Sequence, residues 1–190
     1  MGLPWIAWNL VLAAVPLALS FPLFRVDREP VGWRWWVGVV AFVAFLPNAP
    51  YVLTDVIHFT DEVKRSSSDL HVAFLVIPKY AALFSMGFLA YALCVARMEH
   101  WLRNRGWSFE RVLAVDIGVH GLCAVGVFIG RVFRFNSWDV VTRPAQVLAV
   151  VRVPQPSSVA IVVLTFLVLA GGTAALRIAN RIRVALDPHR

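Results

Sequence analysis

The chain has 190 residues, of which 59% are hydrophobic and only 15% are charged. A soluble domain carries about 45–50% apolar and about 25% charged residues, so this composition excludes an ordinary soluble protein and indicates one that lies in a bilayer. The formal net charge is +7. The arginines are spread over short loops between apolar segments, which excludes the single basic tail or stripe of a nucleic-acid-binding protein.

Five apolar segments are long enough to cross a membrane, because about 30 Å of hydrocarbon takes about 20 helical residues. We predict spans at residues 3–24, 35–53, 70–96, 111–130 and 157–176. These segments take up most of the chain and leave no room for a soluble domain. The sequence therefore predicts an all-α fold, a polytopic transmembrane helical bundle in which residues 1–190 form a single integral membrane domain.

The loop charges predict how the chain is threaded. Five spans place the amino terminus, loop 54–69 and loop 131–156 on one face and the other loops and the carboxyl terminus on the opposite face. The first face holds six basic residues, namely Lys64, Arg65, Arg131, Arg134, Arg143 and Arg152. The opposite face holds eleven arginines, namely Arg25, Arg28, Arg34, Arg97, Arg103, Arg105, Arg111, Arg177, Arg181, Arg183 and Arg190. By the positive-inside rule, the amino terminus is outside and the carboxyl terminus is cytoplasmic.

The stretch "PNAPYVLTDVIHF", residues 47–59, places polar side chains at the outer end of the second span. Its two prolines predict that the helix breaks near residues 47–50 and that a new helix begins, with Asn48 as its N-cap. Asn48, Tyr51, Asp55 and His58 are spaced by three, four and three residues. This spacing keeps all four on one helical stripe, which we expect to line a wet pocket.

Asp55 and His58 are the candidate catalytic residues of this stripe. Three residues apart on a helix, they have the spacing of a hydrogen-bonded pair or of a general acid and base. A metal site needs at least one more ligand, so we predict no metal and no cofactor. The alternative is structural: Asp55 caps a helix or balances an arginine while His58 lies at headgroup level.

A second polar cluster, "GRVFRFNSWDVVTRP" at residues 130–144, lies at the outer end of the fourth span. Its arginines offer paired donors that suit a phosphate or a carboxylate. The predicted ligand-binding residues of the two clusters are Asn48, Tyr51, Arg131, Arg134, Asn136 and Asp139. The alternative is that Arg131 and Arg134 pair with Asp55 and Asp139 and clamp the two loops together. In either case we expect Asp55 within ion-pair reach of Arg131 or Arg134.

Lys79, Asp116 and His120 are the charged or titratable groups that we place deepest within the predicted spans. We predict that Lys79, Asp116 and His120 form one buried group that faces the interior of the bundle, since charges at membrane depth are costly and pair with one another. The group is either a structural ion pair or part of a proton path.

Three segments resemble the signature motifs of a known family, namely "WNLVLAAVPLAL", "FLPNAPYVLTDVIHF" and "GRVFRFNSWDVV". In sequence and order they are similar to those of domain of unknown function 1361, an uncharacterised family of bacterial polytopic membrane proteins. The resemblance covers most of the chain and implies a multi-pass protein of the bacterial cytoplasmic (inner) membrane. It supplies no catalytic residues.

The sequence favours an extracytoplasmic polar pocket that binds an anionic or lipid-phosphate headgroup, in a membrane-embedded transferase or hydrolase or in a protein without catalysis. Two alternatives stay open: a small transporter or proton-handling protein, and a non-catalytic assembly partner. The expected partners are membrane lipids and an anionic or phosphate-bearing ligand, with no nucleic acid; the sequence names no protein partner.

Overall fold

The computed structural model describes residues 3–27, 32–133, 139–151 and 156–185, and within these residues it contains helices and no strand. This confirms the predicted all-α fold. The α-helices are α1 Leu3–Leu23, α2 Gly32–Phe45, α3 Asn48–Tyr51, α4 Val56–Arg65, α5 Asp69–His71, α6 Ile77–Asn104, α7 Phe109–Val132, α8 Asp139–Thr142, α9 Pro144–Val151 and α10 Pro156–Ala185. A 3₁₀ turn, Val52–Asp55, joins α3 to α4, and a π-helical turn, Val72–Val76, joins α5 to α6.

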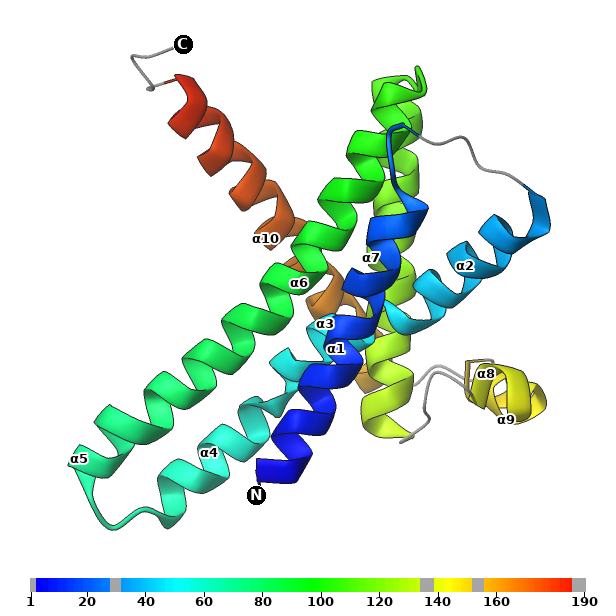
Figure 1. The fold of residues 1–190 in the computed structure, drawn as a ribbon. Coiled ribbons are helices and arrows are strands. Elements are labelled where there is room, and N and C mark those ends of the chain that lie inside the picture. Colours follow the sequence, from blue (N-terminus) through cyan, green and yellow to red (C-terminus); the bar gives the residue numbers. More distant parts are fainter. Residues whose placement is uncertain (1–2, 28–31, 134–138, 152–155, 186–190) are drawn as a thin grey trace.

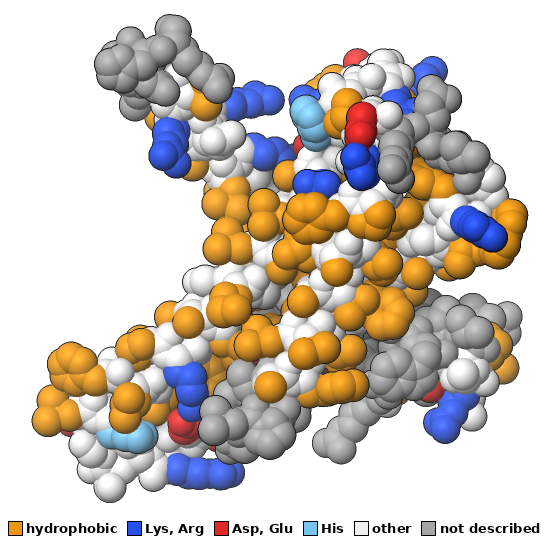
Figure 2. Space-filling view, viewed as in Figure 1, with side chains coloured by type: hydrophobic (Ala, Val, Ile, Leu, Met, Phe, Trp, Pro, Cys, Tyr) orange, Lys and Arg blue, Asp and Glu red, His pale blue; other side chains and the backbone are white. Residues whose placement is uncertain are grey.

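Four helical stretches are long and apolar enough to cross a membrane: Gly32–Arg65, Asp69–Asn104, Phe109–Val132 and Ser158–Val184. A fifth apolar stretch, Ala7–Leu23 within α1, is shorter. These helices indicate a multi-pass membrane protein. Figure 2 shows hydrophobic side chains across the middle of the visible face and charged side chains towards its two ends. Such an apolar band between charged ends is what a bilayer requires.

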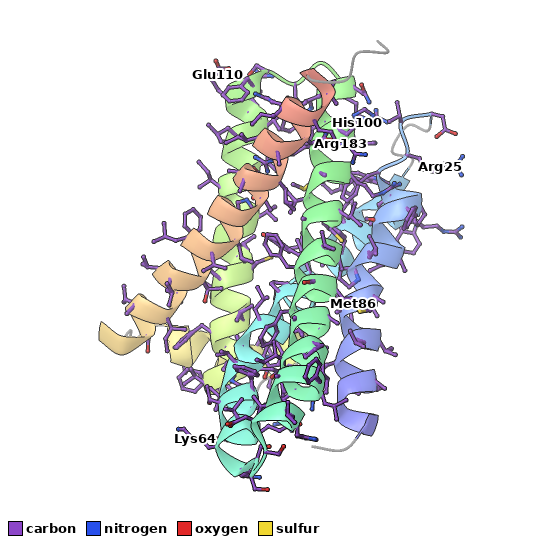
Figure 3. All side chains as sticks on the ribbon, turned by 90° about the vertical axis from the view of Figure 1, so that its left-hand side faces the viewer. Arg25, Lys64, Met86, His100, Glu110 and Arg183 are labelled. Atoms are coloured by element: carbon purple, nitrogen blue, oxygen red, sulfur yellow. The ribbon has the colours of Figure 1, made fainter. Side chains whose placement is uncertain are left out.

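Helices α1, α6 and α7 run along the length of the molecule, and the carboxyl-terminal half of α10 leads away from them (Figure 1). Helix α1 packs against α2, α3 and α6, and α7 packs against α10. Figure 3 shows Arg25, His100, Glu110 and Arg183 at one end and Lys64 at the other. We call the end with Lys64, where α7 finishes, the Lys64 end, and the opposite one the Arg25 end.

The predicted break in the second span is present, and it lies at Leu46 and Pro47, between α2 and α3. The N-cap position of α3 is Pro47, so the prediction that Asn48 would occupy it is wrong. The Asn48 side chain instead donates from Nδ2 to the carbonyl oxygen of Phe45, at 3.0 Å. It therefore satisfies an unpaired carbonyl at the end of the preceding helix rather than an amide at the start of the next.

Helix α3 is held between α6 and α7 by close approaches at two glycines. A Cβ atom on Gly87 of α6 would lie 2.7 Å from the carbonyl oxygen of Ala49, and one on Gly126 of α7 would lie 2.6 Å from Cγ of Pro47. Any larger residue at these positions would push α3 away. The two glycines thus allow the broken helix to enter the bundle, with Asp55 buried just after α3.

Candidate functional site

Asp55 ends the 3₁₀ turn that follows α3, and its side chain is fully buried. Its Oδ1 atom lies 3.4 Å from Nη1 of Arg131, in the last turn of α7. The predicted ion pair between the two polar clusters is therefore confirmed. The pair is unequally placed, because the Arg131 side chain is 22% exposed and that of Asp55 is 0% exposed. Asp55 Oδ2 has no hydrogen-bond partner among the described residues.

The rest of the predicted stripe does not continue as one regular helix. The 3₁₀ turn has about three residues per turn instead of 3.6, which changes the direction of the side chains between Tyr51 and His58. Asn48 turns back to α2, whereas Tyr51 and His58 are half-buried. The structure thus buries Asp55 inside the protein, whereas Tyr51 and His58, four residues before it and three after it, are partly exposed to solvent.

The second polar cluster is seen only in part. Arg134 and Asn136 lie outside the described residues. Asp139 is buried at the start of α8, where its Oδ1 accepts a 3.3 Å hydrogen bond from Thr142 and lies 4.0 Å from Nε of Arg143. Of the two described residues predicted in this cluster, Arg131 and Asp139, the structure brings Arg131 to Asp55.

The prediction that Lys79 joins Asp116 and His120 is wrong. Lys79 Nζ lies 2.5 Å from Oε1 of Glu62 on α4, and the hydroxyl of Tyr80 donates to the other oxygen of Glu62 at 3.1 Å. The physical reason is the length of the helical stretch Asp69–Asn104, whose 36 residues extend about 54 Å, against about 30 Å of hydrocarbon. Lys79 therefore lies beside α4, far along the stretch from the depth of Asp116, and its side chain is 39% exposed.

Asp116 and His120 do belong to a buried polar group, and their charged partner comes from α10. Arg177 Nη2 donates to Oδ2 of Asp116 at 2.7 Å and also donates to Oε1 of Glu99 on α6. The side chains of Glu99 and Asp116 are 9% and 5% exposed. One guanidinium thus ties α6, α7 and α10 together.

His120 extends this group towards the middle of the bundle. The hydroxyl of Tyr91 lies 2.5 Å from Nδ1 of His120, and Thr173 Oγ1 lies 3.2 Å from Nε2. Asp116 Oδ2 lies 3.7 Å from the same Nε2 atom. We call Tyr91, Glu99, Asp116, His120, Thr173 and Arg177 the central network.

The contacts in the central network fit a neutral His120. The Thr173 hydroxyl donates to the carbonyl oxygens of Leu169 and Ala170, at 2.9 and 3.0 Å. Its oxygen can therefore accept from Nε2–H of His120, while Nδ1 accepts from the hydroxyl of Tyr91. In this tautomer every polar atom of His120 has a partner.

Sequence reasoning missed four members of the central network: Tyr91, Glu99, Thr173 and Arg177. Glu99 and Arg177 were assigned to a loop and to the carboxyl-terminal tail because the predicted spans ended at residues 96 and 176, whereas α6 and α10 continue to Asn104 and Ala185. The available signal was the spacing of Thr173 and Arg177. They are four residues apart, as Asp116 and His120 are, so each pair presents one face to a neighbouring helix.

Within the described residues no group of three or more His, Cys, Asp or Glu side chains is placed to hold a metal ion. The family model described as "Protein of unknown function (DUF1361)" matches residues 8–171. No curated protein and no solved structure gives a significant match. The chain therefore belongs to the DUF1361 family, and its apolar helices are those of an integral membrane protein.

Proposed function

We propose that this protein lies in the bacterial cytoplasmic membrane with its Lys64 end outside and its Arg25 end in the cytoplasm. The excess of arginines at the Arg25 end supports this orientation. A reporter fused to the carboxyl terminus is expected to be active in the cytoplasm. Alkaline phosphatase fused at the same position should be inactive, and activity there would contradict the proposed orientation.

In this proposal the outer Asp55–Arg131 pair is the binding site for an anionic, phosphate-bearing headgroup. The observation that carries it is the unequal burial of the pair: a fully buried carboxylate holds one guanidinium nitrogen, while the arginine itself is 22% exposed. A guanidinium has five N–H donors in a planar fork, so Arg131 retains donors for a phosphate after it has paired with Asp55. Arg134 and Asn136, which follow within five residues, are the proposed additional ligands.

The burial of Asp55 favours a positioning role over direct chemistry. A carboxylate with no exposed surface does not reach a ligand at the membrane surface, whereas it does fix the orientation of Arg131. His58, which is half-buried, is the member of the proposed catalytic pair that retains access. Transfer or hydrolysis of a lipid-linked phosphate would therefore use His58 as the acid or base.

Native mass spectrometry of the purified protein with phosphatidylglycerol tests the headgroup site. We expect Arg131→Gln to lose one bound lipid, and Arg143→Gln, on the same side of the molecule but with a 61% exposed side chain, to keep it. Equal lipid binding by the two variants would exclude Arg131 as a ligand. Loss of the lipid in Arg131→Gln but not in His58→Ala would indicate binding in which His58 takes no part.

Proton handling is a second candidate function, favoured by the charges of the central network. Arg177 serves two carboxylates, and Arg103 reaches only Glu99, at 3.7 Å and with a 46% exposed side chain. Asp116 Oδ1 is buried without a hydrogen-bond partner among the described residues. A proton added at Nδ1 of His120 would give an imidazolium beside Asp116, and the hydroxyl of Tyr91 would then accept instead of donate.

A proton flux assay in liposomes tests this second candidate. We expect Asp116→Asn to abolish a flux that the wild type and Arg181→Gln share, because Arg181 is an exposed residue of the same helix as Arg177. If Asp116→Asn conducts as the wild type does, the central network is structural only.

A further inference from the structure

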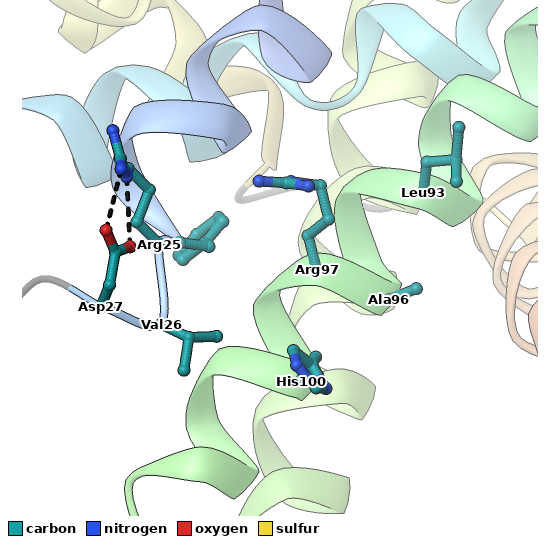
Figure 4. Close-up of a pocket in the computed structure, with 8 residues that line it drawn as sticks. Arg25, Val26, Asp27, Leu93, Ala96, Arg97 and His100 are labelled. Carbon is teal, nitrogen blue, oxygen red and sulfur yellow. Dashed lines mark hydrogen bonds and ion pairs between the residues drawn. The ribbon is translucent and has the colours of Figure 1, made fainter.

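A cavity of about 410 Å³ opens at the Arg25 end, between the chain that follows α1 and the last turns of α6. Figure 4 shows Arg25 and Asp27 on one side of it and Arg97 and His100 on the other. Apolar side chains, including Phe24 and Leu93, complete the lining. The cavity thus combines cationic groups with an apolar wall, and it lies at the opposite end of the molecule from Arg131.

Arg97 differs from the paired arginines of the molecule. Arg103, Arg131 and Arg177 each lie within 4.0 Å of a carboxylate. Arg97 has no such partner among the described residues, and its guanidinium lies over the ring of Phe21, 4.2 Å from the centroid. Its Nε atom is buried, and no described residue accepts a hydrogen bond from it. A guanidinium that contacts an aromatic ring but no carboxylate retains N–H donors for an anion that enters the cavity.

The other polar groups of the cavity supply hydrogen-bond donors and a net positive charge, both of which favour an anion. The amide of Asn104 donates to Nε2 of His100 at 2.9 Å, so in this tautomer Nδ1 carries a hydrogen and is a donor. Arg25 donates to both oxygens of Asp27, at 3.2 and 2.8 Å. Asp27 is the opposing charge, but this pair is exposed and such pairs are weak. With both arginines and Asp27 ionised, the cavity carries a net positive charge.

Tryptophans mark the cavity as lying at headgroup level. The indole of Trp35 donates to the carbonyl oxygen of Leu23, at the end of α1, and stacks on Trp101 with ring centroids 5.3 Å apart. Trp33 and Trp36 lie exposed on the adjoining helix. Tryptophan is enriched where a bilayer changes from hydrocarbon to headgroups, which is also where lipid phosphates lie.

We propose that this cavity binds the phosphate of an anionic phospholipid, with Arg97 as the principal ligand and with Arg25 and His100 as supporting donors. Basic pockets beside transmembrane helices are the sites at which anionic headgroups bind. The apolar wall receives the glycerol and the first acyl carbons. The inference does not rest on the headgroup site at Arg131, which belongs to other helices and to the other face.

Native mass spectrometry with phosphatidylglycerol also tests this site. We expect Arg97→Gln to weaken the binding of one lipid by about tenfold, the effect of losing a charge-assisted contact. Arg111→Gln, an exposed arginine at the same end, is the matched control and should bind as the wild type does. In the double variant Arg97→Gln, Arg131→Gln the two effects should combine, with one lipid lost and the other weakened, so each site can fail its test separately.

Asp27→Asn should have the opposite effect on lipid binding. Because Asp27 is exposed, we expect the variant to fold, which its unfolding temperature checks. It removes the opposing charge and releases Arg25, so binding should tighten several-fold. Unchanged affinity in both Arg97→Gln and Asp27→Asn would overturn the proposal. Equal binding of phosphatidylcholine, or displacement of the lipid by millimolar inorganic phosphate, would overturn the assignment to an anionic lipid.

Discussion

The Asp55–Arg131 pair, which we call the outer pair after its proposed orientation, and the central network are both built from carboxylates and arginines, but they differ in how the charges are shared. In the outer pair one buried carboxylate meets one arginine that is 22% exposed, at 3.4 Å. In the central network one arginine, Arg177, pairs with two buried carboxylates, and the other members, such as Tyr91, are neutral hydrogen-bonding groups. Arg131 meets one carboxylate and so retains N–H donors for a ligand. Arg177, whose side chain is 34% exposed, uses its donors on two carboxylates and thereby holds three helices together.

Among these charged residues, we expect replacement of Arg177 to cause the largest loss of stability. Arg177→Met leaves Glu99 and Asp116 buried without their common partner, and removal of one partner from a buried ion pair costs about 3–5 kcal/mol. The measurement is thermal or denaturant unfolding in detergent. Arg181→Met, an exposed neighbour on the same helix, should unfold as the wild type does. If both variants lose the same stability, Arg177 is not the link between the helices.

At the outer pair we expect a smaller loss. Arg131→Met leaves one carboxylate unpaired, at a cost of about 1–3 kcal/mol, because a single buried Asp55 can take up a proton. Asp55→Asn in the same background should restore most of that loss. A loss as large as that of Arg177→Met would mean that the outer pair is a structural clamp, and it would remove the basis for a ligand site.

Close packing of α3 against α6 determines the position of Asp55, so it should also affect the stability of the outer pair. Gly87→Ala places a methyl group against the carbonyl oxygen of Ala49. Overpacking costs about 1–3 kcal/mol, offset by about 0.5–1 kcal/mol from the better helix propensity of alanine. Gly121→Ala, with no atom within 4 Å of the added carbon, should be neutral or stabilising. Equal unfolding temperatures for the two variants would show that α3 is not held at Gly87.

The smallest effect is expected at Lys79. Its pair with Glu62 is partly exposed, and exposed pairs contribute about 0–1 kcal/mol. Lys79→Met should therefore unfold close to the wild type. A loss of stability comparable to that of Arg177→Met would contradict the exposed pair and would support the buried group of Lys79, Asp116 and His120 that the sequence predicts.

The contrast between Asp55 and Lys79 shows what a sequence can predict in such a protein. The Asp55–Arg131 pair followed from two polar clusters at helix ends on the same face, a relation that span order determines. To predict whether Lys79 contacts Asp116, one must know the membrane depth of each residue and the rotation of each helix about its axis. Both depend on helix tilt and on the residue at which each helix ends. Because α6 and α10 run past their predicted ends, the predicted spans leave Glu99 in a loop and Arg177 in the carboxyl-terminal tail. Apolar length predicts that a span exists more reliably than it predicts which polar residues lie inside it.

We propose that Arg131, which meets a single carboxylate, binds an anionic ligand, whereas Arg177 of the central network, which meets two, does not. Experimental density for the protein in nanodiscs that contain phosphatidylglycerol tests this most directly. We expect a lipid phosphate within about 3.5 Å of the Arg131 guanidinium, the reach of a hydrogen bond, with Asp55 still paired behind it. Arg131 in contact with Asp55 alone, in a map that shows ordered headgroups elsewhere on the same leaflet, would contradict it.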